Sequence, residues 1–315
     1  MLFARMILKL LLTVLLALLI VLGWSKRDAV YDWWRLRGYD PPKTVVELAK
    51  HGTMTDKARH LFYINRPALI ADKTKFQKAC TKTEQTIVLG CYQSPQLGIS
   101  IFDVRDKRLA GVEEVTAAHE MLHAAYDRLS SDERQQIDGW LNDFYKNDLK
   151  DQRIKKNIAS YKKTEPKDIV NEMHSIFGTE VRQLPSNLEK YYQRYFGNRL
   201  KVVAYSEKYE AEFTAREQQA KEILTQLKSL EAQISQSQAN LAAVRQQLEA
   251  DRGSIDSQAE ADAFNARVNA YNAEVANLNS LVDQYNSLRL QYNQLVLQQR
   301  QLLKAIDTRS KIDKQ

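Results

Sequence analysis

Hydrophobic residues in the C-terminal third of the chain recur at intervals of three and four. These intervals match the a and d positions of a heptad, a pattern typical of long helices that pack in pairs. Two such series are separated near Gly253 and predict an antiparallel coiled-coil hairpin over residues 205–308, followed by a tail over residues 309–315. The two series consist of Leu227, Leu230, Ile234, Leu241, Val244 and Leu248, and of Phe264, Val268, Tyr271, Val275, Leu278, Val282, Tyr285 and Tyr292.

A different pattern lies near the N-terminus, where residues 10–24 form an uncharged apolar run. Together with the apolar residues just before it, this run matches the ~30 Å hydrocarbon core of a bilayer. Arg5 and Lys9 lie at its start, as in a signal anchor. We therefore predict a transmembrane signal anchor over residues 1–25 and a polar juxtamembrane linker over residues 26–43. A cleaved signal peptide is the alternative.

Residues 44–204 combine strand-like and helix-like patterns. Residues 85–92 and 97–104 are rich in strand-forming side chains and flank a Ser-Pro turn, so they are predicted to form a β-hairpin. Residues 112–129 contain no Gly or Pro and keep a helical spacing of apolar positions. The predicted fold class is therefore α+β and mainly α, with a small β-sheet in this domain, an N-terminal transmembrane helix and the C-terminal hairpin.

The length of the chain and its net charge agree with this predicted fold class. The chain has 315 residues, enough for one compact domain with extensions. Its net charge is +7, and basic residues gather at residues 144–167. This segment could contact anionic lipid or a wall polymer, or it could be an ordinary solvated helical face. No nucleic-acid-binding module accompanies the charge, so we expect no nucleic-acid partner.

The cysteines bear on the compartment. The chain has only 2, Cys80 and Cys91, at a spacing that permits one disulfide across a turn. Two free buried thiols are the alternative. A disulfide requires an oxidising environment, and we therefore place the bulk of the chain outside the cytoplasm, held at the cell membrane by the single-pass anchor.

The strongest chemical signal is the sequence H-E-x-x-H at residues 119–123. On a helix, His119 and His123 lie on one face, one turn apart, so both imidazoles can bind one Zn²⁺. Glu120 lies about 100° around the helix, where it can take a proton from a metal-activated water without binding the metal. A helix with two incidental surface histidines is the alternative interpretation.

The longer segment at residues 116–125, T-A-A-H-E-M-L-H-A-A, resembles the extended signature of the zincin metallopeptidases. The resemblance covers about residues 44–200. It implies a zinc-binding domain in which a sheet precedes the active-site helix and its edge strand aligns an extended substrate by main-chain hydrogen bonds. The metzincin branch of this family has a third His at a fixed distance after the motif. This chain has no His at that position, which argues against the metzincin branch.

A catalytic zinc needs a third protein ligand. The helix predicted at residues 168–180 contains N-E-x-x-S, beginning at Asn171. This segment resembles the gluzincin branch, in which a second helix donates a glutamate, and the resemblance implies Glu172 as the third ligand. His174 and Glu180 remain alternatives.

The gluzincin motif is incomplete here, because Ile176 stands where that branch has an Asp that contacts a zinc-bound His. Glu180 is our expected substitute for this contact, and Gly178 is the expected C-cap of the helix. A further side chain should stabilise the oxyanion of the reaction. The candidates for that role are Tyr161, His174 and Tyr192.

Together these features predict a membrane-anchored, extracytoplasmic zinc metallopeptidase that hydrolyses peptide bonds of a peptide or protein substrate. Its zincin-like domain would span residues 44–204 and its lipid contacts would come from the anchor. The alternative is a non-catalytic cell-envelope scaffold or binding protein, in which the coiled coil contacts an envelope protein or a wall polymer. A zinc hydrolase that acts on a non-protein amide also fits the sequence.

Overall fold

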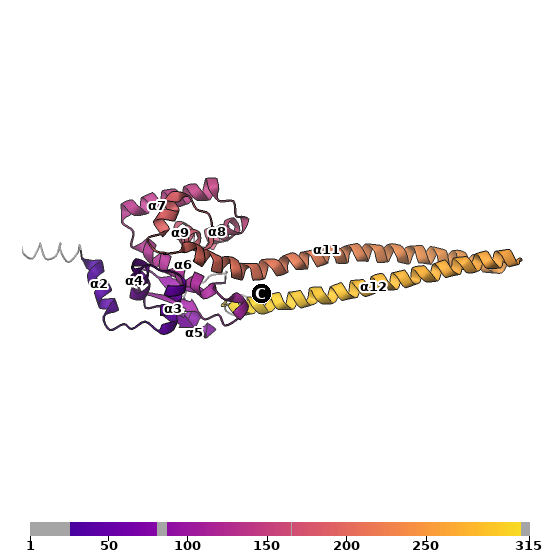
Figure 1. Ribbon diagram of the computed structural model, residues 1–315, viewed down its shortest axis with the longest axis horizontal. Coiled ribbons are helices and arrows are strands. Elements are labelled where there is room, and N and C mark those ends of the chain that lie inside the picture. The colour runs from indigo at the N-terminus through magenta and orange to yellow at the C-terminus, as the bar shows by residue number, and fades with distance from the viewer. Residues whose placement is uncertain (1–25, 81–86, 165, 310–315) are drawn as a thin grey trace, which may run out of the picture. The chain divides into compact units, whose positions relative to one another are not determined.

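The computed structural model describes residues 26–80, 87–164 and 166–309 (Figure 1). The chain divides into two compact units. The first, which we call the mixed unit, contains the chain up to Tyr209 and again from Ile306. The second, which we call the hairpin unit, is Glu210–Ala305.

The mixed unit consists mainly of short helices. Their bounds are α2 (Arg27–Leu36), α3 (Lys43–His51), α4 (Asp56–Ile64), α5 (Lys73–Ala79), α6 (Val112–Asp127), α7 (Ser131–Asp143), α8 (Gln152–Thr164), α9 (Ile169–Glu180), α10 (Ser186–Tyr192) and the first turns of α11 (Arg199–Asp251). A short 3-10 turn, Lys107–Leu109, precedes α6, and a π-helical turn, Phe144–Asp148, follows α7.

A three-stranded sheet completes the mixed unit. Its strand order is β1 (Ala68–Ile70), β3 (Gly98–Phe102), β2 (Gly90–Gln93), with β1 parallel and β2 antiparallel to β3. The predicted hairpin is confirmed as β2 and β3, in a register that pairs Gly90 with Ile101. Strand β1 was not predicted, because a strand of 3 residues is too short to show alternation. Strand β2 lies at the edge of the sheet.

Helix α6 is the centre of the core of the mixed unit. Nearly every side chain from Val112 to Tyr126 is buried, and the helix packs against β2, β3, α3, α4 and α9. It begins after Gly111, whose φ of 108° suits glycine and whose Cβ, if present, would lie 2.9 Å from Tyr205 Cβ. The acidic first turn at Glu113 and Glu114 agrees with the positive end of the helix dipole.

Helix α9 approaches α6 most closely at a glycine. A Cβ on Gly178 would lie 2.4 Å from Leu122 Cδ1 and 2.8 Å from Tyr192 Cε1. The expected role of Gly178 as a C-cap is therefore wrong, because α9 continues to Glu180. Its role is to let two buried helices pack closely.

The predicted juxtamembrane linker is largely folded. Within residues 26–43, helix α2 packs on α4. Arg35 Nε donates to the Ile64 carbonyl at 2.8 Å, and Tyr31 Oη donates to the Gln96 carbonyl at 2.8 Å. Side chains of α2 thus satisfy backbone acceptors of the mixed unit.

The hairpin unit confirms the predicted antiparallel helical hairpin. Helix α11 ends at Asp251, a 3-10 turn spans Arg252–Ser254, and α12 spans Gln258–Ile306 (Figure 1). Ser237 Oγ donates to Glu274 Oε1 at 2.8 Å across the seam. The polar Ser237 in the predicted seam therefore has a partner. Val244, which was also expected in the seam, is 37% exposed.

After α12 the chain returns to the mixed unit. Lys73 Nζ donates to the Asp307 carbonyl and Gln77 Nε2 to the Thr308 carbonyl, each at 2.6 Å. Thr308 Oγ1 in turn donates to the Val88 carbonyl at 2.6 Å. The last residues of the predicted coiled-coil segment thus belong to the mixed unit, because their backbone bonds to α5 and to the chain that leads into β2.

The predicted membrane anchor requires a correction. Among the described residues, no helix is both long and apolar enough to cross a membrane. The buried helix α6 has 16 residues, whereas about 20 are needed to span a bilayer. This finding overturns the transmembrane helix in the predicted fold class and the predicted membrane location. The segment on which both were based, residues 1–25, lies outside the described part of the chain.

Replacing Gly178 by Ala should lower the free energy of unfolding by about 1–3 kcal/mol, because the added methyl group meets Leu122 and Tyr192. The matched control is Gly139→Ala in α7, where no atom lies within 4 Å of the new Cβ. That control should leave stability unchanged or raise it by up to ~1 kcal/mol. Urea denaturation of the metal-free chain measures both, and equal stabilities would contradict this account of the α6–α9 packing.

Candidate metal centre

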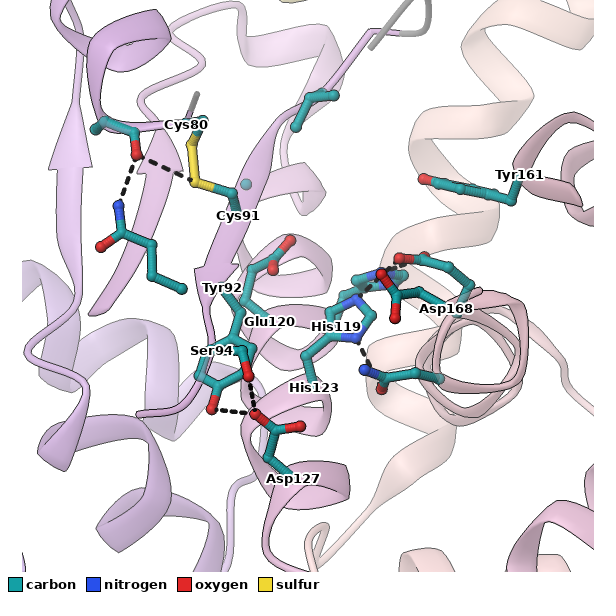
Figure 2. A pocket seen from close by; sticks show the side chains of 16 residues that line it. Cys80, Cys91, Tyr92, Ser94, His119, Glu120, His123, Asp127, Tyr161 and Asp168 are labelled. Carbon is teal, nitrogen blue, oxygen red and sulfur yellow. Dashed lines mark hydrogen bonds and ion pairs between the residues drawn. A yellow bond between two sulfur atoms is a disulfide. The ribbon is translucent and has the colours of Figure 1, made fainter. Parts of the chain in front are cut away.

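Two helices bring the three predicted metal ligands together. Helix α6 carries His119 and His123 on one face (Figure 2). Helix α9 places Glu172 close to both of them. His119 Nε2 lies 3.5 Å from Glu172 Oε2, and His123 Nε2 lies 3.5 Å from Glu172 Oε1. One ligand atom from each of the three residues lies within 4.8 Å of the other two. This buried set of three side chains, which we call the metal group, could hold a metal ion.

The separations suit a small cation. Two ligand atoms at tetrahedral positions, each about 2.0–2.1 Å from a zinc ion, are roughly 3.3 Å apart. The 3.5 Å between each imidazole nitrogen and its carboxylate oxygen is close to that value. The three side chains are 15%, 10% and 6% exposed for His119, His123 and Glu172. The protein therefore encloses most of each ligand side chain and leaves a small part of each exposed.

Asn171 orients one of the imidazoles. Its Oδ1 lies 2.9 Å from His123 Nδ1, so a hydrogen on Nδ1 leaves Nε2 with a lone pair for the metal. Glu180, the expected substitute for this kind of contact, instead pairs with Arg153: its Oε2 accepts from Arg153 Nη1 at 2.8 Å. The signal for Asn171 was present in the sequence, because it is the first residue of the N-E-x-x-S segment.

The site is electrostatically prepared for a cation. Burial alone lowers the pKa of His119, but the hydrogen bond to Glu172 and the surrounding carboxylates outweigh it and raise the pKa to about 9. A proton on His119 is thus stabilised by the negative potential of the pocket. The same potential stabilises a metal cation.

His174 lies outside the metal group. Its Nε2 is 2.8 Å from Tyr191 Oη, and its ring packs among Tyr126, Tyr191 and Tyr192. Burial, with a smaller contribution from the charges of the other two histidines, holds its pKa well below the usual value. His174 is therefore a neutral core residue. The structure places neither alternative third ligand, His174 or Glu180, in the metal group.

The Glu120 carboxylate lies against the sheet, in the same cavity as the three ligand candidates. It is 6% exposed, and a Cβ on Gly90 of β2 would lie 2.8 Å from its Oε1. Only a glycine on the edge strand leaves room for this carboxylate, a requirement that the sequence pattern did not reveal. The general-base candidate thus extends from α6 toward β2, the edge strand of the sheet.

The three ligand candidates, Glu120 and Asn171 line one cavity of about 320 Å³. Figure 2 shows its walls: α6 forms the floor, β2 one side, and α8 and the start of α9 the other. Tyr161 of α8 lines the cavity, whereas the other two oxyanion candidates do not. Tyr192 is buried and donates its hydroxyl to the His174 carbonyl at 2.6 Å.

A disulfide completes the wall on the side of the sheet. Cys80, just after α5, is bonded to Cys91 of β2, with a Cα–Cα distance of 5.8 Å (Figure 2). The disulfide interpretation is therefore confirmed over the one with free thiols. Both cysteines line the cavity, so the bridge ties α5 to the strand that faces the metal group.

No protein-family model matches this chain, and neither does any curated protein or solved structure. The assignment of the site therefore depends on its own geometry. What that geometry establishes is a buried His119, His123 and Glu172 group that could hold a metal ion, at the floor of a cavity beside a sheet edge.

Glu172→Gln should lower zinc affinity by at least about 100-fold, because an amide oxygen is a far weaker zinc ligand than a carboxylate. The matched control is Glu180→Gln on the same helix, which breaks the ion pair with Arg153 but leaves the ligand group intact. Competition with a chelator of known affinity at pH 7 measures both variants. A larger loss for Glu180→Gln would reassign the third ligand.

Proposed function

We propose that this protein is a zinc-dependent metallopeptidase. The observation that carries the proposal is the arrangement of four side chains: His119, His123 and Glu172 form a metal-capable group, and Glu120 lies beside it toward the sheet edge. Two His and one Glu are a ligand set used by catalytic zinc, which keeps a further position for water. The ligand types also favour zinc over calcium or magnesium, which prefer oxygen donors.

The bound ion would lower the pKa of water and polarise the scissile carbonyl. The side chains then have separate tasks. Glu120 accepts the proton of the attacking water on a carboxylate oxygen and delivers it to the nitrogen of the departing amine. Asn171 keeps the His123 ring in one orientation. Burial of these groups keeps bulk water away from the proton transfer.

Strand β2 supplies a means of holding a peptide. Within the described part of the chain it pairs with β3 on one side only, and its residues Gly90–Gln93 line the cavity. An extended peptide can add to such an edge through main-chain hydrogen bonds, with little demand on its sequence. The carbonyl to be cleaved would then face both the metal group and Glu120. An edge strand beside the metal group favours a peptide over a small non-protein amide as the substrate.

Tyr161 is the candidate for stabilising the oxyanion. In Figure 2 its hydroxyl points into the cavity from the side opposite β2. A hydroxyl in that position can donate to the carbonyl oxygen as negative charge develops on it. The other two candidates are enclosed in the core.

Glu120→Gln should retain zinc and lower peptide hydrolysis by about 10²–10⁴-fold, because the amide keeps the shape but cannot accept the proton. Cleavage of a mixed fluorogenic peptide library by the zinc-loaded chain measures activity. The matched control is Glu114→Gln, on the same helix but outside the cavity lining, and should stay active. Full activity in Glu120→Gln would exclude this base. A zinc-loaded parent without hydrolysis would favour a binding protein that acts through its coiled coil.

Tyr161→Phe should lower kcat by about 10²-fold or more and leave KM nearly unchanged, because the lost hydrogen bond forms only as the oxyanion develops. Tyr145→Phe is the matched control, since Tyr145 lies under Lys162 and does not line the cavity. Steady-state kinetics on one library peptide distinguish the two. A raised KM with normal kcat would make Tyr161 a substrate-binding residue instead.

A further inference from the structure

Asp127 is a cavity residue to which the proposed chemistry gives no role. It is the last residue of α6 and lines the same cavity as the metal group (Figure 2). It follows His123 by one helical turn, which places the two residues about 6 Å apart along the helix. In an extended peptide this distance corresponds to roughly two residues. Asp127 is thus within reach of the substrate residue next to the scissile bond, or of the substrate residue one position beyond it.

The carboxylate of Asp127 is held by two hydroxyl donors. Tyr92 Oη donates to Oδ2 at 2.8 Å, and Ser94 Oγ donates to the same oxygen at 2.6 Å. Both donors come from β2 and the turn that follows it. The backbone N–H of Gln96 donates to Tyr92 Oη at 2.7 Å and so fixes the tyrosine as well. The side chain is therefore fixed through Oδ2, and these contacts leave Oδ1 for another donor.

The surroundings of Asp127 favour a cation. The negative end of the α6 dipole lies at this residue. Arg128, the next residue in the chain, is paired with Asp28 at 3.2 Å and with Asp32 at 2.5 Å. Among the described residues that line the cavity there is no Lys or Arg, although the chain carries a net charge of +7. A carboxylate at a helix C-terminus, in a cavity whose described lining carries no basic side chain, is a receptor for positive charge.

We propose that Asp127 determines specificity by binding a cationic group of the substrate on the N-terminal side of the scissile bond. The side follows if the peptide adds antiparallel to β2, which runs from Gly90, beside Glu120, toward Tyr92, beside Asp127. A peptide that adds antiparallel to β2 has its N-terminal part at Asp127. The cation is a Lys or Arg side chain or the free α-ammonium group of a short N-terminal segment. The cleavage step depends on the proposed function, whereas the binding of the cation does not.

The test uses the full zinc-loaded chain and labelled peptides that differ at the two residues before the scissile bond. These carry Lys, norleucine or Glu, each with a free or an acetylated N-terminus. Fluorescence anisotropy gives Kd, and hydrolysis gives kcat/KM. The parent should bind the cationic peptides at least about tenfold more tightly than their neutral counterparts. Loss of the preference on acetylation assigns the α-ammonium group, and its persistence assigns the side chain.

Asp127→Asn should remove the preference, and Asp127→Lys should reverse it in favour of Glu. Ser94→Ala keeps the carboxylate but removes one donor, so it should weaken the preference if the Asp127 variants fail to fold. The matched control is Asp168→Asn, which also removes a carboxylate from the cavity lining. It should retain the preference.

Two results would overturn the proposal. One is equal binding of cationic and neutral peptides by the parent. The other is an equal loss of preference in Asp168→Asn, which would assign the effect to the summed charge of the cavity and not to Asp127. Preferential binding without hydrolysis supports the role of Asp127 and counts against the peptidase. Hydrolysis without a preference for cationic peptides supports the peptidase and counts against the role of Asp127.

Discussion

The close packing of α9 on α6 is the constraint on which the rest of the site depends. The two helices meet where Gly178 faces Leu122, with no room for a Cβ. This contact sets the separation at which Glu172 reaches across to the two histidines of α6. The metal group is thus built from two segments about fifty residues apart, and a methyl group at the contact would separate them.

The buried charges explain why this packing and a cation belong together. Burying carboxylates and imidazoles is costly unless they are paired. Glu172 lies 3.5 Å from an imidazole nitrogen of each histidine, and the hydrogen bond to Glu172 and the nearby carboxylates raise the pKa of His119 despite its burial. A divalent cation could take the place of that proton among the same ligand atoms. The site is therefore organised for positive charge before any ligand binds.

The sheet positions residues that line the cavity. Its three strands are short, but β2 brings Gly90 to Glu120 and Tyr92 to Asp127, and the disulfide at Cys91 ties the strand to α5. The returning C-terminus adds a further tie, because Thr308 binds the Val88 carbonyl just upstream. The edge that faces the cavity is thus held at both its start and its end.

The sequence by itself determined the features that depend on local spacing. These were the α6 face with His119 and His123, the β-hairpin before it, and the two heptad series that pair as a hairpin. Tertiary structure decided what spacing cannot express. It selected Glu172 over the nearby His174, because the aromatic core encloses the histidine. It also made Gly178 a packing residue and placed Asp127 in the cavity, since contacts between distant segments leave no periodic signal in a single sequence.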